Sequence, residues 1–254
     1  MTIIEIPDSW MGKPIDGALE RVLAKKNVVV PSQVQPASPI ILPGQINPRD
    51  YITVPGYNIV IAKAETHKNR NWLETLDDLG AEGLMVPTIA QFMCHWMNVK
   101  TAVVDGMNIL QYADGTAVPN TEAEDLWKYM SSGHRGGCWT WLNARFLENG
   151  GNWKMVSEYK GTSSKNVEVD LKCRIRQDKL VGLAFNDKGF PELESQETSY
   201  KAGQNIYFYH PRNNTVAWFN ANSDWADLGC GGDPSDRDAS LGVLACAAGV
   251  AQKK

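Results

Sequence analysis

The sequence predicts an α+β fold in which helices come first and an antiparallel sheet follows. Helix-start signals precede apolar residues at helical spacing in the first half of the chain. Beyond Trp141, short alternating runs separated by turn-forming residues replace this pattern. The 254 residues contain neither internal repeats nor a low-complexity tract. We therefore expect helices packed on small antiparallel sheets, in one large domain or two small ones.

The first fifty residues carry the weakest structural signals. Asp16–Asn27 has the spacing of a short amphipathic helix, and Val28–Val30 is rich in β-branched residues. Pro31–Pro48 contains five prolines and is therefore extended or looped rather than helical. We expect residues 1–50 to form an extended segment that packs on a main domain spanning residues 51–254.

The main domain opens with a strand and a helix. Tyr57–Lys63 is rich in β-branched residues, which favours a strand. Asn69 or Asn71 is placed to cap a helix that ends at Gly80. The expected buried face of this helix comprises Trp72, Leu76 and Leu79.

Two further helices are predicted from their first residues. Thr88 follows Pro87 and is the expected N-cap of the second helix, and a T-x-x-E capping box formed by Thr121 and Glu124 starts the third. The residues expected to pack inward are Ile89, Phe92, Met93 and Trp96 in the second helix, and Leu126, Trp127 and Met130 in the third.

The second half of the chain predicts strands. The candidates are Val167–Leu171, Cys173–Arg176, Leu180–Phe185 and Asn205–His210. Turn-forming residues at 186–189 and 201–203 separate the later ones.

The stretch Asn214–Cys246 is the most informative for function. Successive side chains of a strand point to opposite faces, which divides its first residues into two sets. The inward set is small or apolar: Ala217, Phe219, Ala221 and Ser223. The outward set is chemically mixed: Trp218, Asn220, Asn222 and Asp224. This division favours a binding surface held by a regular scaffold, and the alternative is an ordinary polar loop.

A family resemblance supports the binding surface. The stretch resembles the C-terminal variable region of diversity-generating retroelement variable proteins, in particular those of archaea and archaeal viruses. The matching frame is Val216-Ala217-x-Phe219-x-Ala221-x-Ser223, Ala226-x-Leu228-x-Cys230, Asp233-Pro234, Leu241-Gly242-Val243 and Ala245. A second matching run is Lys63-Ala-Glu65-Thr66-His67-x-Asn69-x-Asn71-Trp72, followed by Gly83-Leu84-x-x-Pro87-Thr88. Leu76 and Leu244 depart from the family pattern, where a histidine and an arginine are usual.

The resemblance implies a C-type lectin fold of the formylglycine-generating-enzyme-like variant. It also implies a non-enzymatic ligand-binding role, and x positions rewritten by adenine-directed mutagenesis. Adenine-rich asparagine codons change to Ser, Asp, Gly, Ala or Tyr, which matches the residue types found here. The implied ligand-binding residues are Trp218, Asn220, Asn222, Asp224, Trp225, Asp227, Gly229, Gly231, Gly232, Ser235, Asp236, Arg237, Asp238 and Ser240. Arg135-Gly136-Gly137 resembles a scaffold turn of the same fold.

Charge and aromatic content indicate the kind of partner. Residues 218–240 hold five aspartates and one arginine, so 1 − 5 = −4, which equals the net charge of the chain. We expect a protein or surface ligand that is basic or polar, with Trp218 and Trp225 as the main anchors. A carbohydrate-binding module using these two tryptophans, and an enzyme of the formylglycine-generating type with a reactive thiol, stay open as alternatives.

Several other classes are disfavoured. The acidic net charge argues against nucleic-acid binding, and no apolar run reaches about 18 residues, the length of a membrane span. Residues 1–15 lack the pattern of a secretory signal, which leaves localisation open, including display on a virus particle.

No cofactor is expected, because the five cysteines show no zinc spacing and Asp233, Asp236 and Asp238 lack the order of an EF-hand loop, with calcium binding at these aspartates as the alternative. Asp233-Pro234 is expected to start a turn. Reduced, buried thiols are expected, with a bridge between Cys230 and Cys246 as the alternative.

Overall fold

The computed structural model describes residues 9–10, 13–14, 46–159, 165–171 and 173–249. The chain forms two compact units, residues 1–35 and residues 36–254. In the first unit, β1 (Ser9–Trp10) pairs with β2 (Lys13–Pro14) in antiparallel register. The predicted helix Asp16–Asn27, the β-rich run Val28–Val30 and most of Pro31–Pro48 lie outside the described residues.

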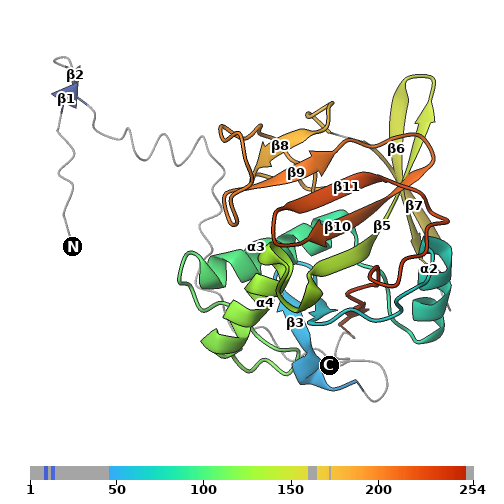
Figure 1. Cartoon of the computed structure of the whole chain (residues 1–254), viewed down its shortest axis with the longest axis horizontal. Helices are drawn as coiled ribbons and strands as arrows, with labels where there is room; N and C mark the ends of the chain where they lie inside the picture. The colour runs from blue at the N-terminus through green and yellow to red at the C-terminus, as the bar shows by residue number, and fades with distance from the viewer. Residues whose placement is uncertain (1–8, 11–12, 15–45, 160–164, 172, 250–254) are drawn as a thin grey trace. The chain divides into compact units, whose positions relative to one another are not determined.

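The second unit is α+β, as the sequence predicts (Figure 1). A seven-stranded sheet has the order β7-β6-β5-β10-β11-β9-β8, and a three-stranded sheet has the order β12-β4-β3. The strands of the larger sheet are β5 (Cys138–Asn149), β6 (Asn152–Tyr159), β7 (Lys165–Asp170), β8 (Lys179–Gly182), β9 (Asn205–Tyr209), β10 (Thr215–Ala221) and β11 (Ala226–Gly232). Those of the smaller sheet are β3 (Tyr51–Val54), β4 (Ile59–Ala62) and β12 (Cys246–Ala248). No helix in the described part of the chain is long and apolar enough to cross a membrane.

The first two helices start where the sequence predicts. Asn71 caps α2 (Trp72–Ala81) through a capping box with Glu74. Thr88 caps α3 (Ile89–Val103) in the same way with Gln91. The predicted stop of α2 at Gly80 is wrong, because the helix continues through Ala81 and the left-handed residue that follows it is Gly83, with φ of 74°.

The third helix starts differently from the prediction. α4 (Asn120–Ser132) has Pro119 at its N-cap and no side-chain cap, so the predicted capping box of Thr121 and Glu124 is wrong. The Pro119 carbonyl instead accepts the N–H groups of Glu122 and Ala123, both at 3.0 Å. Helix formation therefore begins before Thr121, whose hydroxyl is already beyond the capping position.

Strand predictions agree with the structure for β7 and β9, and the predicted strand Leu180–Phe185 overlaps β8 but ends later than its last residue, Gly182. The predicted strand Tyr57–Lys63 begins only at Ile59, since Asn58 lies in a turn with φ of 48°. Cys173–Arg176 forms no strand, although Cys173 and Ile175 are buried and the two arginines are exposed. The long β5–β6 hairpin, which turns at Gly150–Gly151, was not predicted as an element.

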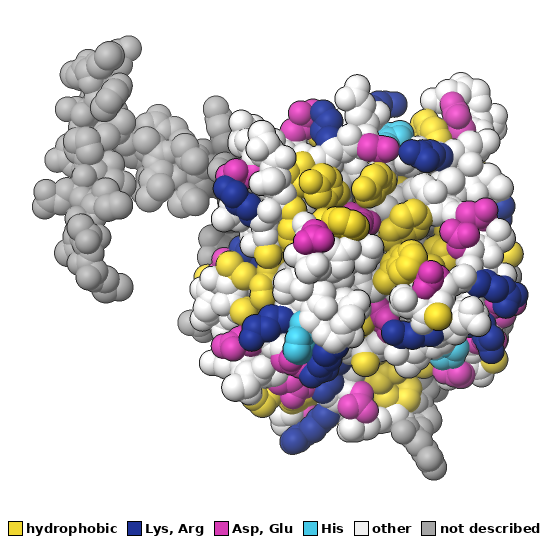
Figure 2. All heavy atoms as spheres, in the orientation of Figure 1, with side chains coloured by type: hydrophobic (Ala, Val, Ile, Leu, Met, Phe, Trp, Pro, Cys, Tyr) yellow, Lys and Arg dark blue, Asp and Glu magenta, His cyan; other side chains and the backbone are white. Residues whose placement is uncertain are grey.

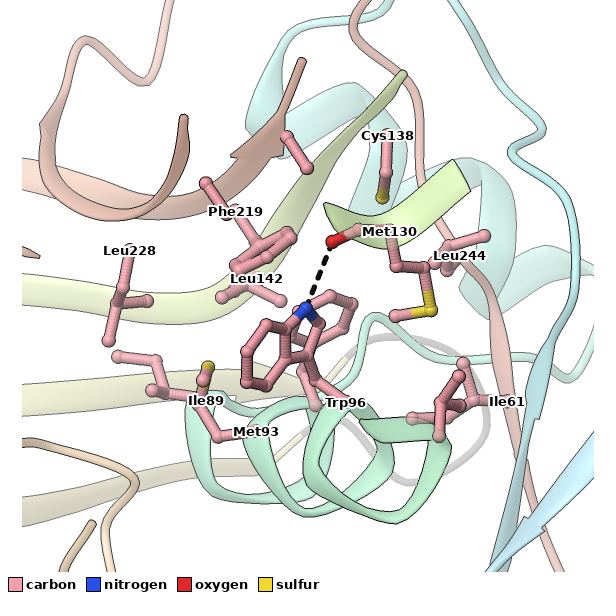
Figure 3. Packing of buried hydrophobic residues seen from close by; sticks show 14 of the residues in the cluster. Ile61, Ile89, Met93, Trp96, Met130, Cys138, Leu142, Phe219, Leu228 and Leu244 are labelled. Atoms are coloured by element: carbon pink, nitrogen blue, oxygen red, sulfur yellow. Dashed lines mark hydrogen bonds between the residues drawn. The ribbon is translucent and has the colours of Figure 1, made fainter. Parts of the chain in front are cut away.

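Two hydrophobic cores lie on opposite faces of β10. Helices α3 and α4 pack on one face, where the centroid of the Phe219 ring lies 4.8 Å from that of Phe92 and 6.2 Å from that of Trp96 (Figure 3). The Trp96 indole donates to the Met130 carbonyl at 2.9 Å, which ties α3 to α4. On the other face, α2 and the segment before β12 form the second core around Trp72, Trp141 and Val216. The second core reaches β10 at Val216, and Trp218 packs against it, while Asn220 farther along the strand keeps solvent contact.

His95 predicts an acid-sensitive stability. It lies in α3 with no exposed surface, and neither ring nitrogen has a hydrogen-bond partner within the described ranges. Burial lowers its pKa from 6.5 to about 4. Because the folded-state pKa is below the unfolded one, stability present above pH 6.5 is lost as pH falls toward 4. Between pH 7 and pH 5 the parent should lose about 2 kcal/mol of unfolding free energy through His95, and His95→Met should not show this loss. Urea unfolding of both proteins at the two pH values measures the difference. Equal pH dependence in parent and variant would contradict this.

Candidate binding surface

The β10–β11 hairpin separates its side chains as the alternation predicts. Strand β10 pairs antiparallel with β11, placing Phe219 opposite Leu228 and Asn220 opposite Asp227. Seven frame residues are at most 1% exposed: Val216, Ala217, Phe219, Ala221, Ala226, Leu228 and Cys230. The inward assignment of Ser223 is wrong, because this residue is exposed in the turn after β10. The frame thus forms the interior of the hairpin.

The Trp218 indole lies on a platform of two glycines. A Cβ atom at Gly229 would lie 2.3 Å from Cε2 of the indole, and one at Gly232 would lie 2.4 Å from its Cζ3. Opposite edges of the ring therefore contact the two backbones, so one ring face covers the strand. The other face is directed away from β11, and the residue is partly exposed although it also packs against the second core.

Asp227 lies beside this indole and is only 3% exposed. The Nε1 group of Trp218 donates to its Oδ1 at 3.2 Å. Burial raises the pKa of Asp227 to about 7, and side-chain hydrogen bonds from Trp218 and Trp225 act in the opposite direction. A carboxyl group with this pKa is partly protonated at neutral pH, so it contributes less negative charge than the sequence count assigns to it.

Two contacts fix the turn between β10 and β11: hydrogen bonds to the Asn222 side chain, and the close approach of Gly137 to the Ala221 backbone. The Asn222 side chain accepts the N–H groups of Asp224 at 2.9 Å and Trp225 at 3.2 Å. Beneath it, Gly137 approaches so closely that a Cβ there would lie 2.1 Å from the Ala221 carbonyl oxygen. Because Gly137 has φ of 82°, both the close approach and the backbone conformation require glycine. The Arg135-Gly136-Gly137 turn therefore supports this hairpin.

The segment after β11 is anchored to α2. Asp233 starts a turn, as predicted, and accepts the N–H group and hydroxyl of Ser235 at 2.8 and 2.6 Å. The Pro234 carbonyl accepts the Trp72 N–H at 3.2 Å, and Arg237 forms an ion pair with Glu74. The loop is thus fixed at its base, while Ser235, Asp236, Arg237 and Ser240 are exposed.

The implied ligand-binding residues occupy three places rather than one patch. The strand face carries Trp218, Asn220, Asp227, Gly229, Gly231 and Gly232; the turn carries Asn222, Asp224 and Trp225; the loop carries Ser235, Asp236, Arg237, Asp238 and Ser240. The turn and the loop lie at opposite ends of the hairpin (Figure 1). Asp227, Gly229 and Gly232 are buried beneath the surface rather than exposed on it, because Trp218 covers them.

Aromatic residues of a neighbouring strand extend the strand face. Strand β9 runs parallel to β11 and places Tyr207 beside Asp227 and Tyr209 beside Gly229. Tyr209 is 40% exposed and Trp225 is 39% exposed. Figure 2 shows hydrophobic side chains gathered over β9, β11 and β10, with acidic side chains around them. The alternation of Tyr207 and Tyr209 with buried Ile206 and Phe208 was visible in the sequence, but their pairing with β11 was not.

The thiols show no sign of activation. All five cysteines are free, so Cys230 and Cys246 form no bridge. Burial raises the pKa of Cys94 and Cys138, and raises those of Cys173 to about 11 and Cys246 to about 12. Burial also raises the pKa of Cys230. These thiols are therefore protonated at neutral pH, the poorly nucleophilic form.

A cavity of about 1010 Å³ lies apart from the hairpin face, between the smaller sheet and α4. Its wall includes Lys63, paired with Glu122, and Arg135, paired with Asp125. Across the described ranges, no group of three or more His, Cys, Asp or Glu side chains is arranged to hold a metal ion.

The glycine platform predicts a sharp contrast between two substitutions. Gly229→Ala places a methyl group inside the Trp218 ring and should cost about 1–3 kcal/mol of unfolding free energy, with a shift in tryptophan fluorescence. Gly231→Ala is the matched control, because its Cβ would lie 3.7 Å from the nearest atom, Cδ of Arg212. Urea unfolding of both variants tests this, and equal stability would show that Trp218 does not rest on Gly229.

A scan against protein-family models, a search of curated proteins and a search of solved structures return no match for this chain.

Proposed function

We propose that this chain is a non-enzymatic ligand-binding protein with a C-type lectin fold, diversified in its C-terminal region. The observation that carries the proposal is the separation of frame and surface in β10 and β11. The seven frame residues are fully enclosed, while Asn220, Asn222, Asp224 and Trp225 keep solvent contact. Burial of large apolar side chains stabilises the fold by about 1.5–3 kcal/mol each, whereas exposed substitutions change stability by about 0.5 kcal/mol or less. Surface residues can therefore change with little effect on folding.

The scaffold around the hairpin also suits this role. Strand β10 lies between β5 and β11 in the larger sheet, its inward face packs on α3 and α4, and Val216 joins the second core. The turn and the loop are each anchored by hydrogen bonds to their own backbone or to α2. A surface held in this way binds a partner without losing much conformational freedom. The partner is a protein or surface ligand.

The diversification is tested by sequencing the DNA that flanks the gene. The proposal predicts a near-copy of the segment encoding residues 214–246, richer in adenine at the implied variable positions, beside a reverse-transcriptase gene. A flank that contains neither feature would refute diversification and leave only a binding surface of fixed sequence.

A further inference from the structure

The geometry points to an arginine side chain of a partner protein as the group that binds the outer face of the Trp218 indole, above Asp227. This inference rests on the proposed binding function and names the chemistry of the partner. It starts from the orientation of the indole, one face of which lies on Gly229 and Gly232. The opposite face is directed away from the sheet, and the faces of an indole carry the negative part of its quadrupole.

Asp227 strengthens this preference for a cation. Its carboxyl group accepts the Nε1–H of Trp218 at 3.2 Å, at the edge of the ring. An anion at the N–H edge polarises the indole and adds electron density to its faces. The carboxyl group is almost fully buried, so the hydrogen bond and the charge act in a medium of lower dielectric constant than water.

The residues around the indole are compatible with a bound guanidinium group. Tyr209 and Trp225 supply exposed aromatic surface on the same face, and Asp224 adds an exposed carboxylate at the turn. Arg212 approaches Gly231 and forms an ion pair with Asp178 at 3.3 Å. The carboxylate of Asp178 therefore offsets the repulsion between Arg212 and a second cation.

Arginine fits this site better than lysine. Trp218 is partly exposed and its ring lies over Gly229 and Gly232, and a planar guanidinium group stacks flat on such a ring. An ammonium group is more strongly hydrated and offers no plane for stacking. A basic partner that presents arginine is therefore preferred over one that presents lysine.

The experiment compares a hexa-arginine, a hexa-lysine and a hexa-glutamate peptide, titrated against the full chain at pH 8 and followed by tryptophan fluorescence and calorimetry. We expect the arginine peptide to bind at least about fivefold more tightly than the lysine peptide, and no binding of the glutamate peptide. Asp227→Asn should weaken arginine binding by about fivefold, whereas Asp236→Asn, which removes the same charge from an exposed loop position, should change it less than about twofold.

Trp218→Phe keeps a ring over the glycines without the N–H donor, and should reduce the preference for arginine even if Asp227→Asn fails to fold. Equal binding of the arginine and lysine peptides, equal effects of Asp227→Asn and Asp236→Asn, or no arginine binding at millimolar concentration would each overturn the inference. The flanking DNA tests the proposed function separately, so an adenine-rich repeat without arginine binding would remove only this assignment.

Discussion

Phe219→Ala should lower the unfolding free energy by about 3–5 kcal/mol, the range for removing a large aromatic side chain from a packed core. Phe219 has no exposed surface and contacts the rings of Phe92 and Trp96, so the surrounding helices cannot fill the space without moving. Urea unfolding followed by circular dichroism measures the loss.

The control for this prediction is the next residue in the chain. Asn220 points to the opposite face and is only partly buried, so Asn220→Ala should change stability by about 0.5 kcal/mol or less. A large loss in Asn220→Ala, or a small one in Phe219→Ala, would show that the two faces of β10 are not divided as described.

The unfolding free energy of the parent should fall as pH rises through the pKa of Asp227, and Asp227→Asn should not show this fall. Burial raises the pKa of Asp227 from 3.8 to about 7, so the folded state favours the protonated carboxyl. A raised folded-state pKa gives a stability contribution that is complete below pH 3.8 and is lost as pH rises through about 7. Between pH 5 and pH 8 the parent should therefore lose about 2–3 kcal/mol relative to the variant.

Urea unfolding of both proteins at pH 5 and pH 8 measures this difference. His95 acts in the opposite direction over part of the same range, so only the comparison of parent with variant isolates Asp227. If the stability difference between parent and variant is the same at both pH values, Asp227 does not titrate as its burial requires.

Local signals in the sequence were sufficient for much of the fold. The capping residues Asn71 and Thr88 lie where their side chains reach the third helical N–H group, a contact within four residues of chain. The burial of Ala217, Phe219 and Ala221 follows from strand alternation alone. Thr121 was misassigned because Pro119, with its fixed φ, starts α4 earlier.

The site was less predictable because it depends on pairing between strands. Trp218 covers Gly229 and Gly232 only in the register set by a bulge between Val216 and Trp218. Asp227 occupies an outward position but is buried, and the cross-strand Trp218 and the nearby Trp225 both hydrogen-bond to it. Tyr207 reaches the face through a parallel pairing of β9 with β11 that no local pattern indicates.

The most direct test of the division between frame and surface uses two libraries of the chain. In one, the seven frame residues of β10 and β11 are varied; in the other, the partly or fully exposed positions Asn220, Asn222, Asp224, Trp225, Asp236 and Ser240 are varied with the same codons. The fraction of members that resist protease reports the fraction that fold. We predict that most surface variants stay folded and most frame variants do not. Equal resistant fractions in the two libraries would contradict the division.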